Sequence, residues 1–171
     1  MTCIVGLEHG GHVYIGADSL GVNSSTLEKT VRDDVKVFTT GPFIMGCTTS
    51  FRMIQLLQYK FVPPAQLAGV DDMRFMVTDF IDSVKKCFTD NGYTNGNFLV
   101  GYNGKLYTIE GDFQVGKASL GYDACGCGSR FALGSMFSNT KLKPLERIKQ
   151  ALAAAAEFSA GVAPPYLVLK K

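Results

Sequence analysis

Thr2 has the most distinctive chemistry in the sequence, because only one residue precedes it. Its side chain is small, so we expect Met1 to be removed, which would leave a threonine with a free α-amine. Such a residue carries a hydroxyl nucleophile and an amine with a pKa of about 7.7–8.0 on one carbon skeleton. The amine can accept the hydroxyl proton, so one residue supplies both nucleophile and general base. Taken alone, a threonine that merely begins a strand is the commoner interpretation.

Asp18 and Lys36 are a candidate ion pair beside this nucleophile. Asp18 ends an apolar segment, and a carboxylate buried there needs a partner because an unpaired buried charge is costly. Lys36 stands between two valines, so its side chain points to the opposite face of an extended segment. If that face is internal, Asp18 is the nearest candidate carboxylate. The alternatives are an aspartate that starts a turn and a solvated lysine on an edge strand.

Other patterns point less well to a known chemistry. His9 and His12 flank two glycines, but a metal site needs a third and a fourth ligand, and none has a recognisable spacing. The Cys-Gly-Cys sequence at 125–127 lacks the second cysteine pair of a structural zinc site. The Gly-x-Gly that overlaps it does not complete a dinucleotide-binding pattern, and no Gly-x-Ser-x-Gly is present. We therefore expect no metal and no cofactor.

The composition is typical of a globular chain with one domain. The chain has 171 residues, and 46% hydrophobic with 19% charged residues excludes a disordered chain. The formal net charge is +2, and no basic run is longer than a pair, so we expect no nucleic-acid partner. No apolar stretch approaches the roughly 20 residues of a membrane span, and no signal peptide is visible, so we expect no membrane partner. Five cysteines favour a reducing, cytoplasmic compartment.

The elements that must position these residues begin with two predicted hairpins. Apolar segments of strand length over 2–7 and 12–18 form the first hairpin, with a Gly-Gly turn between them. Segments 35–39 and 43–48 form the second hairpin around Gly-Pro. The polar segment 19–34 is predicted to be a loop between them.

Helices and a second group of strands follow. Helical periodicity covers 50–59. It is clearest from Met73 to Phe88, where an apolar face includes Val77, and Asp71 or Asp72 is placed to cap the start of this helix. The remaining predicted elements are strands 98–102, 105–110, 113–115 and 124–127, helices 129–137 and 145–159, and a closing strand 166–169. Strands grouped before helices, twice over, indicate antiparallel sheets with helices outside them. We predict one α+β domain over residues 1–171, built as a four-layer αββα sandwich.

Four motifs in this order resemble the proteasome β-subunits and the bacterial HslV peptidase. They are Thr-x-Ile-Val-Gly at 2–6, Gly-x-Val-x-Ile-Gly-Ala-Asp-Ser at 11–19, Val-Lys-Val at 35–37, and Gly-Cys-Gly-Ser-Arg-Phe-Ala-Leu-Gly at 126–134. The last is similar to the family's Gly-Ser-Gly-Ser-x-Tyr-Ala-x-Gly. The approximate similarity covers most of the chain. These proteins are N-terminal nucleophile hydrolases, so the resemblance implies the αββα sandwich that the element order also predicts.

The resemblance implies a role for each matched residue. Thr2 would be the nucleophile and Asp18 and Lys36 its electrostatic partners, with a cationic Lys36 keeping the α-amine neutral. The oxyanion donor would be a backbone N–H near Thr49, in the loop after the fourth strand. That loop reads Thr-Ser where the family has Gly-Gly, which narrows its backbone freedom. Lys36 also lies two residues further along the chain than the family's lysine.

The resemblance also implies a group of supporting residues. Cys127 stands where the family has the serine that supports the threonine amine, and a thiol is the weaker hydrogen-bonding group. Ser129 belongs to the same motif and is a further candidate. Glu157 falls where the family has an aspartate on its fourth helix, with a partner serine near Ser159 or Ala160.

Two functions are therefore considered. In the first, the chain is a threonine endopeptidase that forms an acyl-enzyme on Thr2 inside a closed homo-oligomeric ring. The resemblance implies unfolded polypeptides as substrates and an ATPase unfoldase as a partner. In the second, the chain is a catalytically inactive ring or assembly protein that keeps the fold as a building block. The altered oxyanion loop, Cys127 and a retained Met1, which would bury the amine in a peptide bond, motivate this alternative.

Overall fold

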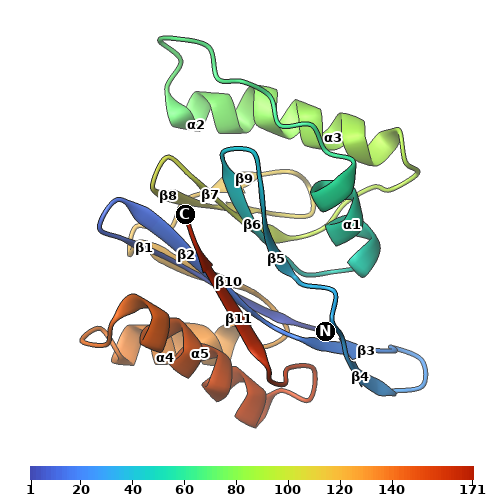
Figure 1. The fold of residues 1–171 in the computed structure, drawn as a ribbon, viewed down its shortest axis with the longest axis vertical. Helices are drawn as coiled ribbons and strands as arrows, with labels where there is room; N and C mark the ends of the chain where they lie inside the picture. The colour runs from blue at the N-terminus through green and yellow to red at the C-terminus, as the bar shows by residue number, and fades with distance from the viewer.

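The computed structural model describes residues 1–171, and its two antiparallel sheets lie face to face between two layers of helices (Figure 1). The first sheet has the order β10-β1-β2-β11. Its strands are β1 (Cys3–His9), β2 (His12–Asp18), β10 (Tyr122–Gly126) and β11 (Tyr166–Lys170). The second sheet has the order β5-β6-β7-β8-β9. Its strands are β5 (Val37–Thr40), β6 (Phe43–Cys47), β7 (Phe98–Tyr102), β8 (Lys105–Ile109) and β9 (Val115–Gly116).

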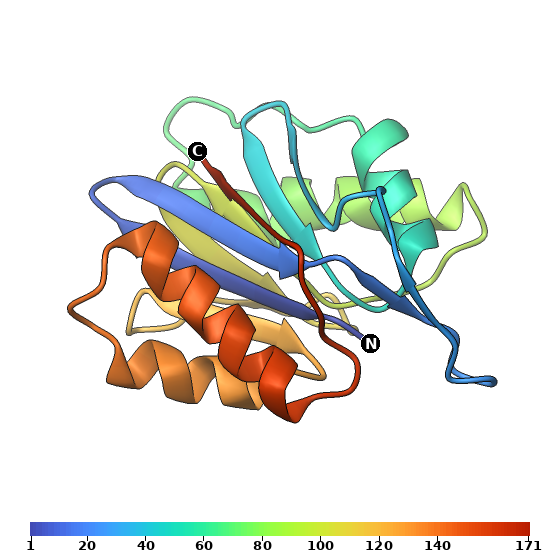
Figure 2. The ribbon, with the colours of Figure 1, turned by 60° about the horizontal axis from the view of Figure 1, so that its bottom comes forward.

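Helices cover the outer face of each sheet. Over the second sheet lie α1 (Phe51–Tyr59), α2 (Asp72–Phe75), the π-helical segment η1 (Met76–Phe80) and α3 (Ile81–Thr89). Over the first sheet lie α4 (Ser129–Ser138) and α5 (Pro144–Phe158), side by side in Figure 2. The predicted αββα sandwich is therefore confirmed. None of these helices combines the length and the hydropathy that a bilayer crossing requires.

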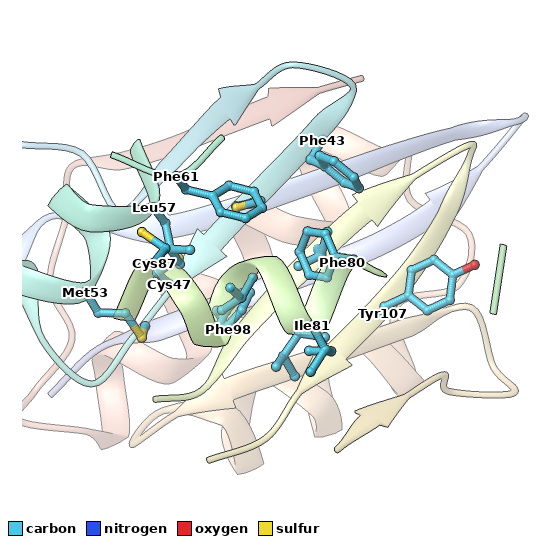
Figure 3. Close-up of a cluster of buried hydrophobic side chains, with 14 of the residues drawn as sticks. Phe43, Cys47, Met53, Leu57, Phe61, Phe80, Ile81, Cys87, Phe98 and Tyr107 are labelled. Atoms are coloured by element: carbon cyan, nitrogen blue, oxygen red, sulfur yellow. The ribbon is translucent and has the colours of Figure 1, made fainter. Parts of the chain in front are cut away.

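Three apolar clusters fill the spaces between the four layers. The largest lies between the second sheet and its helices, where the ring centroids of Phe43 and Phe80 are 4.8 Å apart (Figure 3). Phe43 also packs on Tyr102, with ring centroids 4.7 Å apart. A second cluster joins the first sheet to α4 and α5, and a third lies between the sheets. Strands β1 and β6 therefore have apolar residues on both faces, which explains their continuous apolar sequences.

Glycines let the two sheets approach closely. A Cβ atom on Gly46 of β6 would lie 2.5 Å from methyl carbons of both Ile4 and Ile15. A Cβ on Gly101 of β7 would lie 2.5 Å from Ile44 and 2.7 Å from Val13. At Gly46 and Gly101, side chains of the cluster between the sheets therefore pack directly against the strand backbone.

Two sequence expectations need correction. The segment 19–34, expected to be a loop, contains a small hairpin of β3 (Leu20–Val22) and β4 (Lys29–Val31), which projects beyond the sandwich in Figure 2. Each of its strands has only three residues, too few for a periodicity signal. The predicted apolar helix face is also wrong in part, because Met73 and Val77 are exposed. Met73 precedes the π-helical segment and Val77 lies within it, and the i→i+5 bonding of this segment rotates the start of the helix relative to α3.

Candidate functional site

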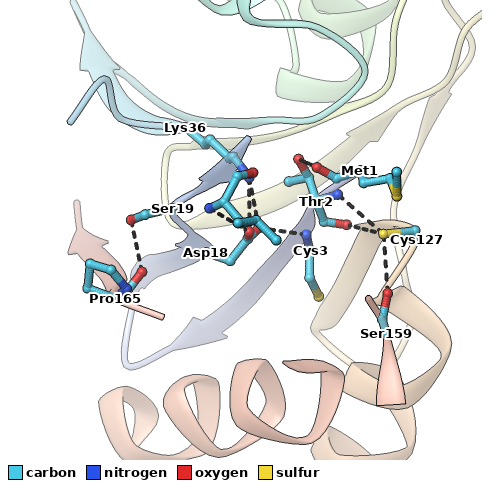
Figure 4. Close-up of polar contacts among 10 residues, drawn as sticks. Met1, Thr2, Cys3, Asp18, Ser19, Lys36, Cys127, Ser159 and Pro165 are labelled. Carbon is cyan, nitrogen blue, oxygen red and sulfur yellow. Dashed lines mark hydrogen bonds and ion pairs between the residues drawn. The ribbon is translucent and has the colours of Figure 1, made fainter. Parts of the chain in front are cut away.

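Thr2, Asp18 and Lys36 gather at one end of the sandwich, between the two sheets (Figure 4). Thr2 precedes β1 and Asp18 ends β2, and the antiparallel pairing of these strands brings the two positions together. Lys36 lies just before β5 of the other sheet, since β5 begins two residues later than expected. All three are buried, with exposed fractions of 5%, 2% and 2%.

The Asp18 carboxylate is the hub of a buried polar network. Lys36 Nζ donates to both of its oxygens at 3.0 Å and to the carbonyl of Leu20 at 2.7 Å. The backbone N–H of Cys3 donates to Oδ1 at 2.9 Å and that of Leu20 to Oδ2 at 3.0 Å. The carboxylate thus ties the start of β1 to the end of β2 and to the lysine. Sequence reasoning paired Asp18 with Lys36 but missed the part played by the Leu20 backbone.

Burial and charge act in opposite directions on the Lys36 ammonium. Removal from water lowers the pKa of Lys36 below its usual 10.5, and the nearby Asp18 carboxylate partly restores it. Burial and the same carboxylate raise the pKa of the Cys3 thiol to about 12. The site therefore holds one compensated ion pair beside a thiol that stays protonated.

Thr2 itself contacts Met1 and Cys127 (Figure 4). Its backbone N–H donates to Cys127 Sγ at 3.3 Å, and its hydroxyl donates to the carbonyl oxygen of Met1. Cys127 Sγ in turn lies 3.5 Å from the Thr2 carbonyl oxygen and accepts from Ser159 Oγ at 3.4 Å. Gly126 makes this approach possible, because at its φ of +97° a Cβ would lie 2.2 Å from the Thr2 oxygen.

A small pocket with a volume of about 70 Å³ opens beside Thr2. It is lined by Met1, Thr2, Val22, Lys36, Thr48, Thr49, Ser50, Phe51 and Ile54. The backbone N–H of Thr49 donates to no group of the chain, so it is free to bind a ligand oxygen. Thr2, Lys36 and Thr49 thus border one space.

The remaining candidates lie apart from this arrangement. Ser129 is half-buried at the first turn of α4, and its hydroxyl makes no hydrogen bond. Glu157 is exposed on α5 and forms neither a hydrogen bond nor an ion pair, so the structure does not bring it to Thr2. Of the two positions expected for the partner serine, Ser159 contacts Cys127 and Ala160 is exposed. No group of three or more His, Cys, Asp or Glu side chains converges as metal ligands would.

Comparison of the fold with solved structures gives strong matches, although no protein-family model and no curated protein matches the sequence. BPH from Thiobacillus denitrificans, in complex with epoxomicin, has a TM-score of 0.81 at 20% identity over 99% of this chain and 98% of that one. Eukaryotic HslV from Trypanosoma brucei has a TM-score of 0.70 at 14% identity over 99% of this chain and 98% of that one. Anbu, an ancestral beta-subunit from Yersinia bercovieri, has a TM-score of 0.70 at 14% identity over 99% of this chain and 81% of that one.

This chain has the N-terminal nucleophile hydrolase fold. The resemblance that the motifs indicated is confirmed at the level of the fold, over nearly the whole length of the chain. In this chain, Thr2 at the start of β1 lies at the end of the sandwich where Asp18 and Lys36 meet (Figure 4).

Proposed function

We propose that this chain is a threonine peptidase that cleaves peptide bonds through Thr2 once Met1 has been removed. One observation carries the proposal: Thr2, Thr49 and Lys36, which is paired with the buried Asp18, border the same pocket, and the Thr49 N–H has no partner within the chain. A nucleophile, a buried cation and an oxyanion donor around one space are what acyl transfer needs.

Each step of the reaction uses a group of this chain. The free α-amine accepts the proton of Thr2 Oγ1, which attacks the carbonyl carbon of the substrate. The Thr49 N–H binds the resulting oxyanion. The protonated amine then gives its proton to the leaving amine, and an ester on Oγ1 remains until a water molecule hydrolyses it. Lys36, with its positive charge held by Asp18, keeps the α-amine neutral and therefore basic.

Thr2→Ala tests this proposal directly. With Met1 removed, as verified by intact mass, the wild-type chain should cleave small fluorogenic peptides. Thr2→Ala should lose this turnover completely, whereas Thr2→Ser, which keeps a hydroxyl, should retain part of it. The circular dichroism spectrum and the melting temperature provide the folding control. Turnover by Thr2→Ala equal to that of the wild type would eliminate the mechanism.

Epoxomicin, the compound in the BPH complex, is a suitable active-site probe. We expect it to stop turnover and to raise the melting temperature of the chain that lacks Met1. The same compound should leave the melting temperature of Thr2→Ala and of the Met1-bearing chain unchanged. Equal stabilisation of all three forms would argue against binding at Thr2.

We further propose that the chain assembles into homo-oligomeric rings in the cytoplasm, where an ATPase unfoldase supplies unfolded polypeptides. The fold shared with HslV and Anbu supports the assembly. All five cysteines are free thiols, which supports a reducing compartment. No nucleic acid or membrane is part of this proposal.

A non-catalytic ring or assembly protein is the second candidate. The observation that favours it is the Met1–Thr2 peptide: the Thr2 nitrogen is an amide, and the hydroxyl donates to the Met1 carbonyl, so this form has no base. Intact mass of the protein isolated from its own cells separates the candidates. A chain that retains Met1, or ordered rings without turnover after Met1 removal, would support the assembly role.

A further inference from the structure

The loop between β6 and α1 contains a strained turn at Thr49. The Ser50 N–H donates to the Thr48 carbonyl at 2.7 Å, which closes a three-residue γ-turn with Thr49 at its centre. The φ angle of Thr49 is +63°, a region that β-branched residues rarely adopt. An observed outlier of this kind beside a candidate site is a reason to ask what holds it there.

Asn97 holds both sides of this turn. Its backbone N–H donates to Thr49 Oγ1 at 3.1 Å, and its carbonyl accepts from the Thr48 N–H at 3.2 Å. Asn97 directly precedes β7, whose first residue Phe98 pairs with Cys47 of β6, so both partners are anchored in one sheet. The Thr49 hydroxyl therefore accepts a hydrogen bond from backbone that is anchored in the sheet.

Glu110 fixes Asn97 in turn. The Asn97 side-chain amide donates to Glu110 Oε2 at 2.6 Å, and Glu110 directly follows β8. The Glu110 backbone is itself held, because its N–H donates to the Gln114 carbonyl at 3.0 Å. A continuous chain of hydrogen bonds thus runs from the end of β8 to the turn that carries the free Thr49 N–H.

We propose that Asn97, held by Glu110, is a positioning residue that orients the Thr49 N–H toward the reacting carbonyl by binding the Thr49 hydroxyl. This inference rests on the proposed function. A glycine at position 49 would adopt the turn without strain but would have no side chain by which to be held. For threonine the backbone conformation of this turn is unfavourable, but its hydroxyl can accept the hydrogen bond from the Asn97 N–H.

Two substitutions of Thr49 separate positioning from simple structural support. Thr49→Val keeps the shape and removes the acceptor, whereas Thr49→Ser keeps the acceptor. Because an oxyanion donor acts mainly in the transition state, we expect Thr49→Val to lower kcat about tenfold with KM within about twofold. Thr49→Ser should stay within about threefold of the wild type. Thr40→Val is the control for loss of a threonine hydroxyl elsewhere, since Thr40 Oγ1 donates to the Leu57 carbonyl at 3.4 Å, outside the pocket.

Glu110 provides a second, independent test. Glu110→Ala should lower kcat severalfold in the wild-type background and should have no further effect in Thr49→Val, because the path to the turn is already broken. Glu110→Gln keeps an acceptor for the Asn97 amide and should restore most of the activity. Additive effects of Glu110→Ala and Thr49→Val would overturn the inference.

Amide hydrogen exchange makes the test independent of turnover. The Ser50 N–H closes the γ-turn, so its exchange rate should rise at least fivefold in Thr49→Val and stay unchanged in Thr49→Ser and Thr40→Val. Unchanged Ser50 exchange in Thr49→Val overturns the role of Asn97 whether or not the protein is active. Absence of turnover in the wild type without Met1 overturns the proposed function and the oxyanion role with it. The exchange data then still decide whether Asn97 holds the turn.

Discussion

At Asp18 and Lys36, two opposite charges lie almost wholly out of reach of water, with side chains 0% and 1% exposed. Their hydrogen bonds with the Cys3 and Leu20 backbone compensate part of the desolvation cost. A buried pair of this kind is sensitive to the loss of one partner, because the other remains buried as an uncompensated charge.

Asp18→Asn should therefore destabilise the fold strongly, by about 3–5 kcal/mol. Urea unfolding followed by circular dichroism measures this change. Asp90→Asn is the matched control, since Asp90, just after α3, pairs with the exposed Lys86 at 2.8 Å and its loss should change stability little. Equal losses in the two variants would show that burial does not set the strength of the Asp18 pair.

The Cys3 thiol makes stability fall at alkaline pH. Its folded pKa is raised to about 12 from 9.0, so the unfolded chain loses the proton first. Above pH 9 the folded state binds more protons than the unfolded state, and stability decreases as the pH rises. Cys3→Ala should remove this contribution, which reaches roughly 1.4 kcal/mol per pH unit. Urea unfolding at pH 8, 9, 10 and 11 checks it; parallel curves for both proteins would contradict the assignment.

The spacing of the two sheets depends on strand positions that have no side chain. Gly46 of β6 lies where a Cβ would be 2.5 Å from both Ile4 and Ile15. Ile4 and Ile15 lie in the paired strands β1 and β2, so the backbone that carries them has little room to move. The elements that carry Thr2 and Thr49 are brought together by this close packing.

Gly46→Ala should destabilise the protein by about 1–3 kcal/mol through overpacking. Gly134→Ala, in the middle of α4 with no atom within 4 Å of the new Cβ, should instead stabilise it, by up to about 1 kcal/mol. Thermal unfolding of the two variants gives opposite shifts if the sheet spacing is the cause. Shifts of the same sign would contradict this account of the core.

On the scale of the whole molecule, the chain has 18.5 kDa and a formal net charge of +2. A chain so close to neutral has little electrostatic repulsion between copies. Large apolar side chains also remain exposed on the outer helices, among them Phe137 and Phe158. Both features favour self-association, as the proposed function requires.

Analytical ultracentrifugation should therefore detect closed assemblies whose mass is a multiple of 18.5 kDa. Thr2→Ala should assemble in the same way, because Thr2 is buried inside its own chain. This variant separates assembly from catalysis, the point on which the two candidate functions differ. A strictly monomeric chain at micromolar concentration would exclude the ring.

The sequence by itself determined those features that depend on neighbours along the chain. Strand and helix patterns follow local periodicity, so the layered sandwich could be predicted from the sequence. The pairing of Asp18 with Lys36 could also be inferred, because burial demands that opposite charges meet.

Only the tertiary structure decided the contacts that join distant segments. Asn97 meets Thr49 across 48 positions, and no periodicity or motif marks a hydrogen bond between a backbone N–H and a hydroxyl so far away. The positive φ of Thr49 is equally invisible in the sequence, since threonine disfavours it and only the surrounding contacts impose it. Glu157 illustrates the converse: its place in the chain suggested a partner of Thr2, but the face of α5 on which it lies is turned to solvent. Packing fixes which face of a helix is buried, and packing is a property of the whole molecule.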